Sequence, residues 1–407
     1  MKINNIFVFI LLFLTCCNTK NDIKTPDLSG IAGTEAVQDS ENSQNFRIIN
    51  KTQTLDLLRE YAYQVMHDNS CPIIWTSNNP DIISIDDNGK MTAKKTGKAL
   101  IQANADADKS DSVEVEVTVN PMYLFEKFHV ERTFGKEVTT NGITVKEQYV
   151  SGSVSLYWTG NLNLENRIIA VNQNRYTGLK ANYDILKAAD LLKKIRSGIL
   201  LEEIKYITYH DTGNNSALAD AELHAYYITS DENLNHRSRS WHYTVDDKKV
   251  IAHIPDNETA WQGDSYDAYG KSIGIETCIA FGSDLYSVWQ RTAKLIAMLL
   301  NKYDLEPDAV KQHNHWSGKN CPEVLRHNGI YDIAMDMVMA EYMTAKYLDG
   351  YNISFESFNT EYVDHCGKVI KTPKEDLMVS YMVKIKNNSG YNESKMFSSV
   401  IKGISAE

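Results

Sequence analysis

The sequence predicts a multidomain protein in which an α/β domain, with a central mixed sheet flanked by helices, lies between two β regions. Three observations support this prediction. The length of 407 residues is enough for two to four domains. Strand-like and helix-like segments alternate over residues 199–346, which is typical of helices packed on a central sheet. Short runs of alternating apolar and polar residues dominate residues 45–119 and 347–407.

The composition excludes several classes of protein. Charged residues make up 23% of the chain and hydrophobic residues 43%, which fits a soluble globular protein rather than a disordered one. The formal net charge of -11 argues against a nucleic-acid partner, because the chain lacks the excess of basic residues that neutralises phosphates. Beyond the N-terminus, no apolar run is long enough to span a membrane.

The N-terminus has the pattern of an export signal. Lys2 precedes the apolar run "IFVFILLFL" (6–14), which is too short for a stable transmembrane helix. We therefore expect residues 1–17 to be a signal peptide and the protein to reside in the cell envelope, facing the periplasm or the cell surface.

The end of this signal predicts a lipid anchor. "LTCC" (14–17) resembles a bacterial lipoprotein cleavage box, with its leucine three residues before Cys17. We expect Cys17 to be lipidated and anchored to a membrane, and the polar residues 18–44 to form a tether. Lipidation at Cys16 fits less well because it would place Phe13 at the leucine position. An ordinary cleaved signal peptide is the alternative.

The first β region, residues 45–119, contains the segment "WTSNNPDIISIDDNGKMTAKKTGKALIQA" (75–103). Its "DNG" tripeptide is typical of a hairpin turn, Gly97 marks a second turn, and apolar residues alternate between them. The segment resembles the Big2-type bacterial immunoglobulin-like domain at Trp75, Ser77, Pro80, Ile85, Asp86, Gly89, Met91, Ala93, Gly97, Ala99 and Ile101. The resemblance implies a spacer or adhesive module, and we assign no catalytic residue to it.

Residues 120–198 are predicted to be a linking β and helical region of unknown fold. "GSVSLYWTG" (152–160) and "RIIAVNQ" (167–173) are strand-like. "YDILKAADLLKKIRSG" (183–198) has apolar residues at helical spacing, and its final glycine is placed to end a helix.

Residues 199–346 carry the alternating elements of the α/β domain. The strand-like segments are "IKYITYH", "WHYTVDD", "KVIAHIP" and "SIGIETCIAF". The helix-like segments are "NSALADAELHAYYITSD", "LYSVWQRTAKLIAMLLNKY" and residues 330–346. β alternation returns in "YNISFESFN", "DLMVSYMVKIKN" and "KMFSSVIKG", so we expect a small β-sandwich-like domain over 347–407.

The loop "VKQHNHWSGKNCPEVLR" (310–326) contains candidate metal ligands. His313 and Cys321 are eight residues apart with a glycine-containing turn between them, and a nitrogen and a thiolate suit tetrahedral Zn(II). His210, at the end of the apolar strand in "YITYHDTGN" (206–214), is the candidate third ligand. Three protein ligands and one open position are typical of a catalytic zinc site. The alternative is a buried histidine and an inert thiol.

The same residues fall in a known family pattern. From about residue 200 to 345 the sequence resembles the zinc-dependent N-acetylmuramoyl-L-alanine amidases of the Amidase_2 class. The matching segments, in the family's order, are "YHDTGN", "WHYTVDDKKVIAHIPDNETAWQGD", "SIGIETC" and "VKQHNHWSGKNCP". The resemblance implies one Zn(II) per chain, held by His210, His313 and Cys321. His315 is left outside the metal shell, because relatives often carry an acid or another polar residue there.

The resemblance also implies two catalytic residues. Glu276, in "SIGIE", matches the family's acid–base candidate, and Lys319 matches the lysine thought to stabilise the oxyanion. Amide hydrolysis supports both roles, because a carboxylate must accept a proton from the attacking water and a cation stabilises the tetrahedral intermediate. The alternatives are a surface carboxylate at a sheet edge and a solvated loop lysine.

Further residues are expected near the substrate groove. Some members of the wider fold carry a catalytic tyrosine where this chain has Trp241, so an aromatic surface is kept and a phenol is lost. His242 either lines the cleft or is a packed core histidine, and both interpretations stay open. Asp211 and "AWQGD" (260–264) are expected to shape the groove without assigned chemistry.

These residues predict hydrolysis of the amide bond between N-acetylmuramic acid and L-alanine in peptidoglycan. One alternative is a non-catalytic peptidoglycan-recognition module on the same fold, but such forms commonly lose the cysteine ligand, which is present here as Cys321. Another is amidase chemistry on a different acylated peptide. The expected partners are peptidoglycan and, through the N-terminal lipid, a membrane.

Overall fold

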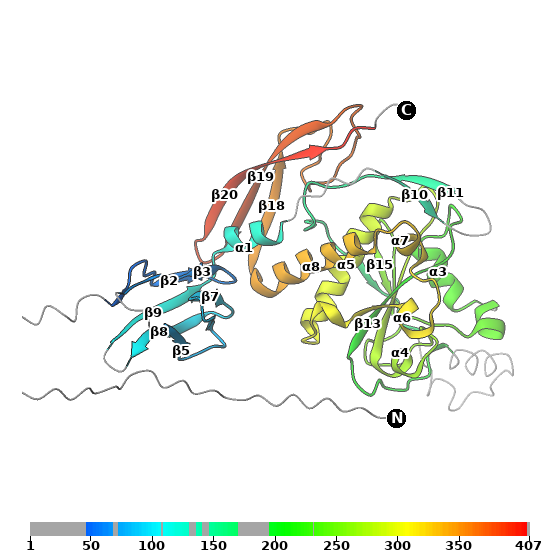
Figure 1. Cartoon of the computed structure of the whole chain (residues 1–407). Coiled ribbons are helices and arrows are strands. Elements are labelled where there is room, and N and C mark those ends of the chain that lie inside the picture. Colours follow the sequence, from blue (N-terminus) through cyan, green and yellow to red (C-terminus); the bar gives the residue numbers. More distant parts are fainter. Residues whose placement is uncertain are drawn as a thin grey trace, which may run out of the picture.

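The computed structural model describes residues 46–67, 72–106, 109–129, 136–140, 146–169, 195–230 and 232–404. The predicted signal peptide, Cys17 and the tether lie outside these residues, as does most of the helix-like segment 183–198. No helix in the described part of the chain combines the length and apolar composition that a membrane crossing requires. The described elements form an N-terminal β region, an α/β domain and a C-terminal sheet (Figure 1).

The N-terminal region is all-β, as predicted. One sheet has the order β2 (Thr54–Asp56), β9 (Lys109–Thr118), β8 (Gly97–Asp106) and β5 (Ile74–Ser77). A second has the order β3 (Glu60–Ala62), β7 (Lys90–Ala93) and β6 (Ile83–Ile85), and β1 (Arg47–Ile48) pairs with β4 (Val65–Met66). The predicted hairpin turn joins β6 to β7. There Gly89 has φ +77°, and a Cβ at this position would lie 2.8 Å from the Trp75 ring, so the turn requires glycine.

A six-stranded mixed sheet forms the centre of the α/β domain, as predicted. Its order is β12 (Leu164–Asn166), β15 (Val250–Ala252), β14 (Tyr243–Val245), β16 (Ser272–Thr277), β13 (Tyr206–Asp211) and β17 (Val310–Gln312). Of the described pairs in this sheet, β14–β15 is antiparallel and the others are parallel. The carboxyl ends of β13, β16 and β17 therefore meet at one edge.

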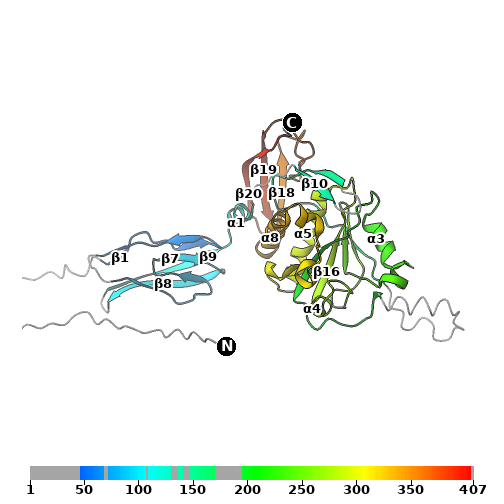
Figure 2. The ribbon, with the colours of Figure 1, turned by 45° about the vertical axis from the view of Figure 1, so that its right-hand side comes forward.

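Helices cover both faces of this sheet (Figures 1 and 2). α5 (Leu285–Lys302) and α8 (Tyr331–Tyr347) pack together on one face, and α3 (Ala221–Ile228) lies on the other. Asp284 caps α5 by accepting a hydrogen bond from the backbone N–H of Ser287. The shorter helices are α4 (Tyr266–Lys271), α6 (His313–Ser317), α7 (Glu323–His327), the π-helix Asn233–Arg237 and the 3-10 turn Pro307–Ala309.

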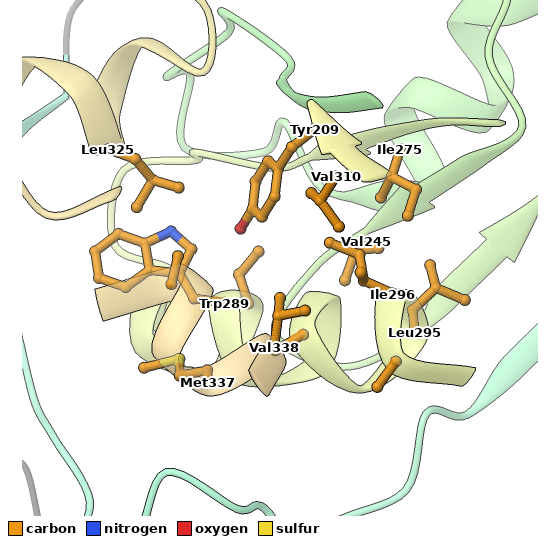
Figure 3. Packing of buried hydrophobic residues seen from close by; sticks show 14 of the residues in the cluster. Tyr209, Val245, Ile275, Trp289, Leu295, Ile296, Val310, Leu325, Met337 and Val338 are labelled. Atoms are coloured by element: carbon orange, nitrogen blue, oxygen red, sulfur yellow. The ribbon is translucent and has the colours of Figure 1, made fainter. Parts of the chain in front are cut away.

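The main core lies between the sheet and the pair α5 and α8. Figure 3 shows sheet residues facing helix residues, among them Tyr209, Val245, Ile275, Val310, Trp289, Leu295, Ile296, Met337 and Val338. Side chains alternate along a strand. Because Ile207 and Tyr209 are buried in this core, Thr208 and His210 point to the opposite face of β13. Burying one large apolar side chain is worth roughly 1.5–3 kcal/mol, so the core fixes which face of the strand His210 occupies.

The sheet extends further upstream than the sequence indicates. The sequence places residues 120–198 in a linking region, but β12 within that range pairs in parallel with β15 at the sheet edge. The hairpin of β10 (Lys136–Thr140) and β11 (Lys146–Val150) also contacts α7. An edge strand of three residues carries too little alternation to be recognised in a sequence.

The C-terminal region is a single antiparallel sheet of β18 (Tyr351–Ser357), β19 (Leu377–Asn387) and β20 (Asn392–Ile401). Its apolar face packs against α1 (Pro121–Phe128), where the Phe125 ring lies 6.1 Å from Phe355 and 6.3 Å from Phe397. The described residues after 347 contain no second sheet, so the expected β-sandwich is corrected. Alternation shows that one face of a sheet is buried, but not whether a sheet or a helix covers it.

Candidate metal centre and active-site pocket

Three buried side chains converge at the edge where β13, β16 and β17 end. His210 is near the carboxyl end of β13, opposite Glu276 of β16 in the parallel register. His313 follows β17 as the first residue of α6, and Cys321 lies between α6 and α7. Candidate ligand atoms of His210, His313 and Cys321 all lie within 4.8 Å of one another. The fold thus brings together the three residues that the sequence predicts as metal ligands.

The geometry of these donors fits a zinc ion. The two histidine Nδ1 atoms are 3.1 Å apart, and Cys321 Sγ is 3.8 Å from His210 Nδ1. Burial and the neighbouring His313 lower the pKa of His210 to about 3, so its ring is neutral, which is the form that binds metals. Burial, with the nearby carboxyl groups, raises the pKa of the Cys321 thiol well above its ordinary value. A divalent cation here would reverse that preference by stabilising the thiolate.

Glu276 lies beside these donors in a mostly enclosed position. Its Oε1 is 4.0 Å from His210 Nδ1, and its Oε2 is buried with no hydrogen-bond partner among the described residues. Burial and the carboxylate of Asp211 raise the pKa of Glu276 to about 8, while Lys319 and Arg239 oppose this rise. The carboxyl group therefore has a high proton affinity and an oxygen with no hydrogen-bond partner in the described part of the chain.

The candidate centre opens into a pocket of about 710 Å³. Glu276, Lys319 and Cys321 line this pocket, and Lys319 is exposed. The lining also includes residues to which the sequence gives no role, among them Leu223, His224, Tyr226, Tyr227 and Arg239. Tyr226 is 73% exposed. Apolar and aromatic residues on the outer side of a short helix are the sequence signal that could have revealed this wall, because a core-facing stripe does not explain them.

Asp211 and Trp241, which the sequence places near the substrate groove, both line the pocket. Asp211 accepts a hydrogen bond from the backbone N–H of Val324 at 2.9 Å, so it also ties β13 to the start of α7. Burial raises the pKa of Asp211 to about 6. The indole N–H of Trp241 donates to Thr244 Oγ1 at 2.7 Å, which fixes the ring against the sheet.

His242 is a packed core histidine, so of the two interpretations that the sequence leaves open, the one that places it in the groove lining is wrong. It is fully buried and is absent from the pocket lining. Its Nδ1 accepts a hydrogen bond from the backbone N–H of Gly274 at 2.9 Å, and its Nε2 donates to the carbonyl of Glu258 at 2.9 Å. Both ring nitrogens are therefore used by the backbone. His315, left outside the metal shell, is exposed and packs edge-on against Trp316.

Comparison with known proteins shows that this site lies in a segment that matches a protein family. Residues 201–324 match the family model described as N-acetylmuramoyl-L-alanine amidase (Amidase_2). This confirms the predicted resemblance for the α/β segment, which contains His210, Glu276, His313, Lys319 and Cys321.

Individual relatives match over the same part of the chain. N-acetylmuramoyl-L-alanine amidase CwlH of Bacillus subtilis (strain 168) is 37% identical over 123 residues, which is 30% of this chain and 48% of the relative. XlyA of the same organism is 36% identical over 122 residues, covering 30% of this chain and 40% of the relative. The chain therefore spans about half the length, or less, of these curated relatives. The solved structure of the catalytic domain of XlyA aligns with 43% of this chain, and the alignment covers 99% of that domain, at 28% identity and a TM-score of 0.35.

Proposed function

We propose that the α/β domain is a zinc-dependent amidase that hydrolyses the bond between N-acetylmuramic acid and L-alanine in peptidoglycan. One observation carries this proposal. Two histidines and a cysteine converge at the strand ends, beside the mostly enclosed Glu276, and open into a pocket within the segment that matches the amidase family. His210, His313 and Cys321 would hold the ion.

A bound Zn(II) would supply Lewis-acid stabilisation of the amide oxygen and a lowered pKa of water. Beside such a cation, the Glu276 carboxyl group ionises more readily than its surroundings alone allow. The unsatisfied oxygen of Glu276 is then a proton acceptor at the edge of the pocket. A bound cation would compensate this oxygen for the hydrogen-bond partner that it lacks among the described residues.

The residues around the pocket would complete the reaction. Water attacks the amide carbonyl carbon, and Glu276 accepts the proton that the water loses. The ammonium group of Lys319 stabilises the negative charge that develops on the carbonyl oxygen. When the C–N bond breaks, Glu276 returns its proton to the departing nitrogen. The products are a carboxylic acid on the sugar side and a peptide with a free amino terminus at L-alanine.

We further propose that the protein is a membrane-anchored lipoprotein of the cell envelope, lipidated at Cys17. In this arrangement the N-terminal β region, as a Big2-type immunoglobulin-like module, acts as a spacer between the anchor and the amidase domain. The motif "LTCC" and the segment resemblance over 75–103 support this proposal.

The test of the amidase function is incubation of the full chain with purified peptidoglycan, followed by mass spectrometry of the soluble products. Zinc content is measured on the same samples. We expect peptides that begin with a free L-alanine, one zinc per chain, and loss of activity on chelation that added zinc restores. If the protein binds zinc and peptidoglycan but releases nothing, it is a recognition module and not an amidase.

A further inference from the structure

We infer that the loop of residues 260–264 orients both histidine ligands of the zinc site, with Gln262 positioning His210 and Asp264 positioning His313. The inference rests on the zinc site proposed above. The sequence suggests that this "AWQGD" loop shapes the substrate groove. In the structure, however, no residue of the loop belongs to the described pocket lining, and Gln262 is buried.

The contact between Gln262 and His210 fixes which nitrogen of the ring carries the proton. The amide Nε2 of Gln262 donates to the carbonyl of Ala268 at 2.8 Å, and a carbonyl can only accept, so the amide oxygen is the end that faces His210. That oxygen lies 2.7 Å from His210 Nε2. A neutral ring must therefore carry its proton on Nε2, which leaves the Nδ1 lone pair free. Nδ1 is the atom that faces His313 and Cys321.

The neighbouring strand leaves room for this arrangement. A Cβ at Gly274, in the middle of β16, would lie 2.8 Å from Cγ and 2.9 Å from Cδ of Gln262. Glycine is thus required at this position for Gln262 to reach His210. The glycine of "SIGIE", two residues before the catalytic candidate Glu276, therefore makes room for the side chain of Gln262.

Asp264 makes the corresponding contact with the second ligand. Its Oδ2 lies 3.1 Å from His313 Nε2, which again leaves Nδ1 to face the centre. The backbone is left-handed at both Gly263 (φ +84°) and Asp264 (φ +57°). A Cβ at Gly263 would lie 2.4 Å from the Ala268 side chain and 3.3 Å from the Trp316 ring, so this turn also requires glycine. Asp264 is 53% exposed, so water competes for its hydrogen bond, whereas the Gln262 bond is sheltered.

The test compares zinc affinities of purified full-length variants by competition with a chelator. Gln262→Leu removes the acceptor, and we expect zinc to bind ~10–100-fold more weakly, as is typical when the outer partner of a ligand histidine is lost. Gln262→Glu keeps an oxygen acceptor for His210 and, in its protonated form, also a donor for the Ala268 carbonyl, so it should bind zinc more tightly than Gln262→Leu. Gln290→Leu is the matched control, because Gln290 is a buried glutamine whose amide has no partner in the described structure. The visible spectrum of the cobalt-substituted protein should change in Gln262→Leu and not in the control.

Each outcome decides a separate point. A wild type without stoichiometric zinc overturns the zinc site and this inference with it. A wild type with zinc, and a folded Gln262→Leu with unchanged affinity and cobalt spectrum, overturns the positioning role alone. If Gln262→Leu does not fold, the metal-free wild type still gives an answer through long-range ¹H–¹⁵N correlation of its histidine rings, assigned with His210→Ala. A proton on Nε2 of His210 supports the inference, and a proton on Nδ1 overturns it.

Discussion

Replacing Glu276 with glutamine should separate catalysis from metal binding. Glutamine keeps the shape of the side chain but cannot accept a proton from the attacking water. We expect kcat to fall ~10²–10⁴-fold, equivalent to about 3–5 kcal/mol of transition-state stabilisation. KM should change less, because the proton transfer contributes mainly in the transition state. Zinc should be retained, since Glu276 is not among the three candidate ligands.

The same substitution should make the metal-free protein more stable. Folding raises the pKa of Glu276 from 4.5 to about 8. Between these values the folded chain binds more protons than the unfolded chain, so its stability falls as the pH rises. At about 1.36 kcal/mol per pKa unit, this loss amounts to at most about 5 kcal/mol above pH 8. Glutamine carries no charge into the site, so Glu276→Gln avoids the loss, and the two proteins should be equally stable well below pH 4.5.

The assay measures turnover on peptidoglycan, zinc content, and urea unfolding of the chelated protein at about pH 4 and about pH 8.5. Glu361→Gln is the control, because Glu361 is an exposed glutamate in the C-terminal region, paired with Lys371 on the surface. Near wild-type turnover of Glu276→Gln with zinc bound would show that the base lies elsewhere. If the difference in unfolding free energy between Glu276→Gln and the wild type is the same at both pH values, the pKa of Glu276 is not raised by folding.

Four further substitutions test other parts of the molecule. Cys321→Ala should lose stoichiometric zinc and activity, and full activity with partial zinc would contradict its assignment as a ligand. Lys319→Ala should bind zinc normally but lower kcat on the order of 10²–10³-fold, as expected for the loss of one oxyanion donor; an unchanged rate would exclude that role. Burial raises the pKa of Glu341 to about 7. Glu341→Gln keeps an acceptor for the backbone N–H of Trp158. In urea unfolding this variant should be more stable than the wild type above pH 7, by at most about 3 kcal/mol, and equally stable near pH 4. Cys17→Ser should abolish metabolic labelling by a fatty-acid analogue, and equal labelling of both forms would refute lipidation at this residue.

The sequence could predict that His210, His313 and Cys321 come together, because their chemistry and their positions depend on short-range patterns. The apolar alternation before His210 indicates a strand that ends at this residue. The eight-residue spacing of His313 and Cys321 allows one loop to carry two ligands. The parallel pairing of β13 with β17 then brings the strand end next to that loop.

The sequence could not predict what supports the centre, because that support comes from contacts between distant segments. Gln262 meets His210 across 52 residues, and no local pattern marks a glutamine as the partner of a histidine. The position of α1 also depends on contacts with a distant segment. Its apolar residues indicate a helix with a buried side, but the sheet that they cover begins more than 200 residues later. The sequence leaves the role of His242 open because it does not show which groups contact the two ring nitrogens. In the structure both nitrogens contact backbone groups.

The arrangement of charge around the centre links the site to the stability of the domain. Burial and Asp211 raise the pKa of Glu276, and burial and both carboxyl groups raise the pKa of the Cys321 thiol; Lys319 at the pocket lining offsets these rises only in part. Without a cation, burial therefore favours the protonated forms of Glu276 and Cys321, which the proposed reaction needs in ionised form. A divalent ion at the two Nδ1 atoms and the sulfur removes this conflict, because its charge favours the carboxylate and the thiolate together. Since the unfolded chain lacks the assembled site, zinc binding should stabilise the fold by an amount that grows with the logarithm of the ratio of free zinc to its dissociation constant. If Gln262 and Asp264 position the two histidine rings as inferred above, their contacts would contribute to the stability of the zinc-bound protein as well as to zinc affinity.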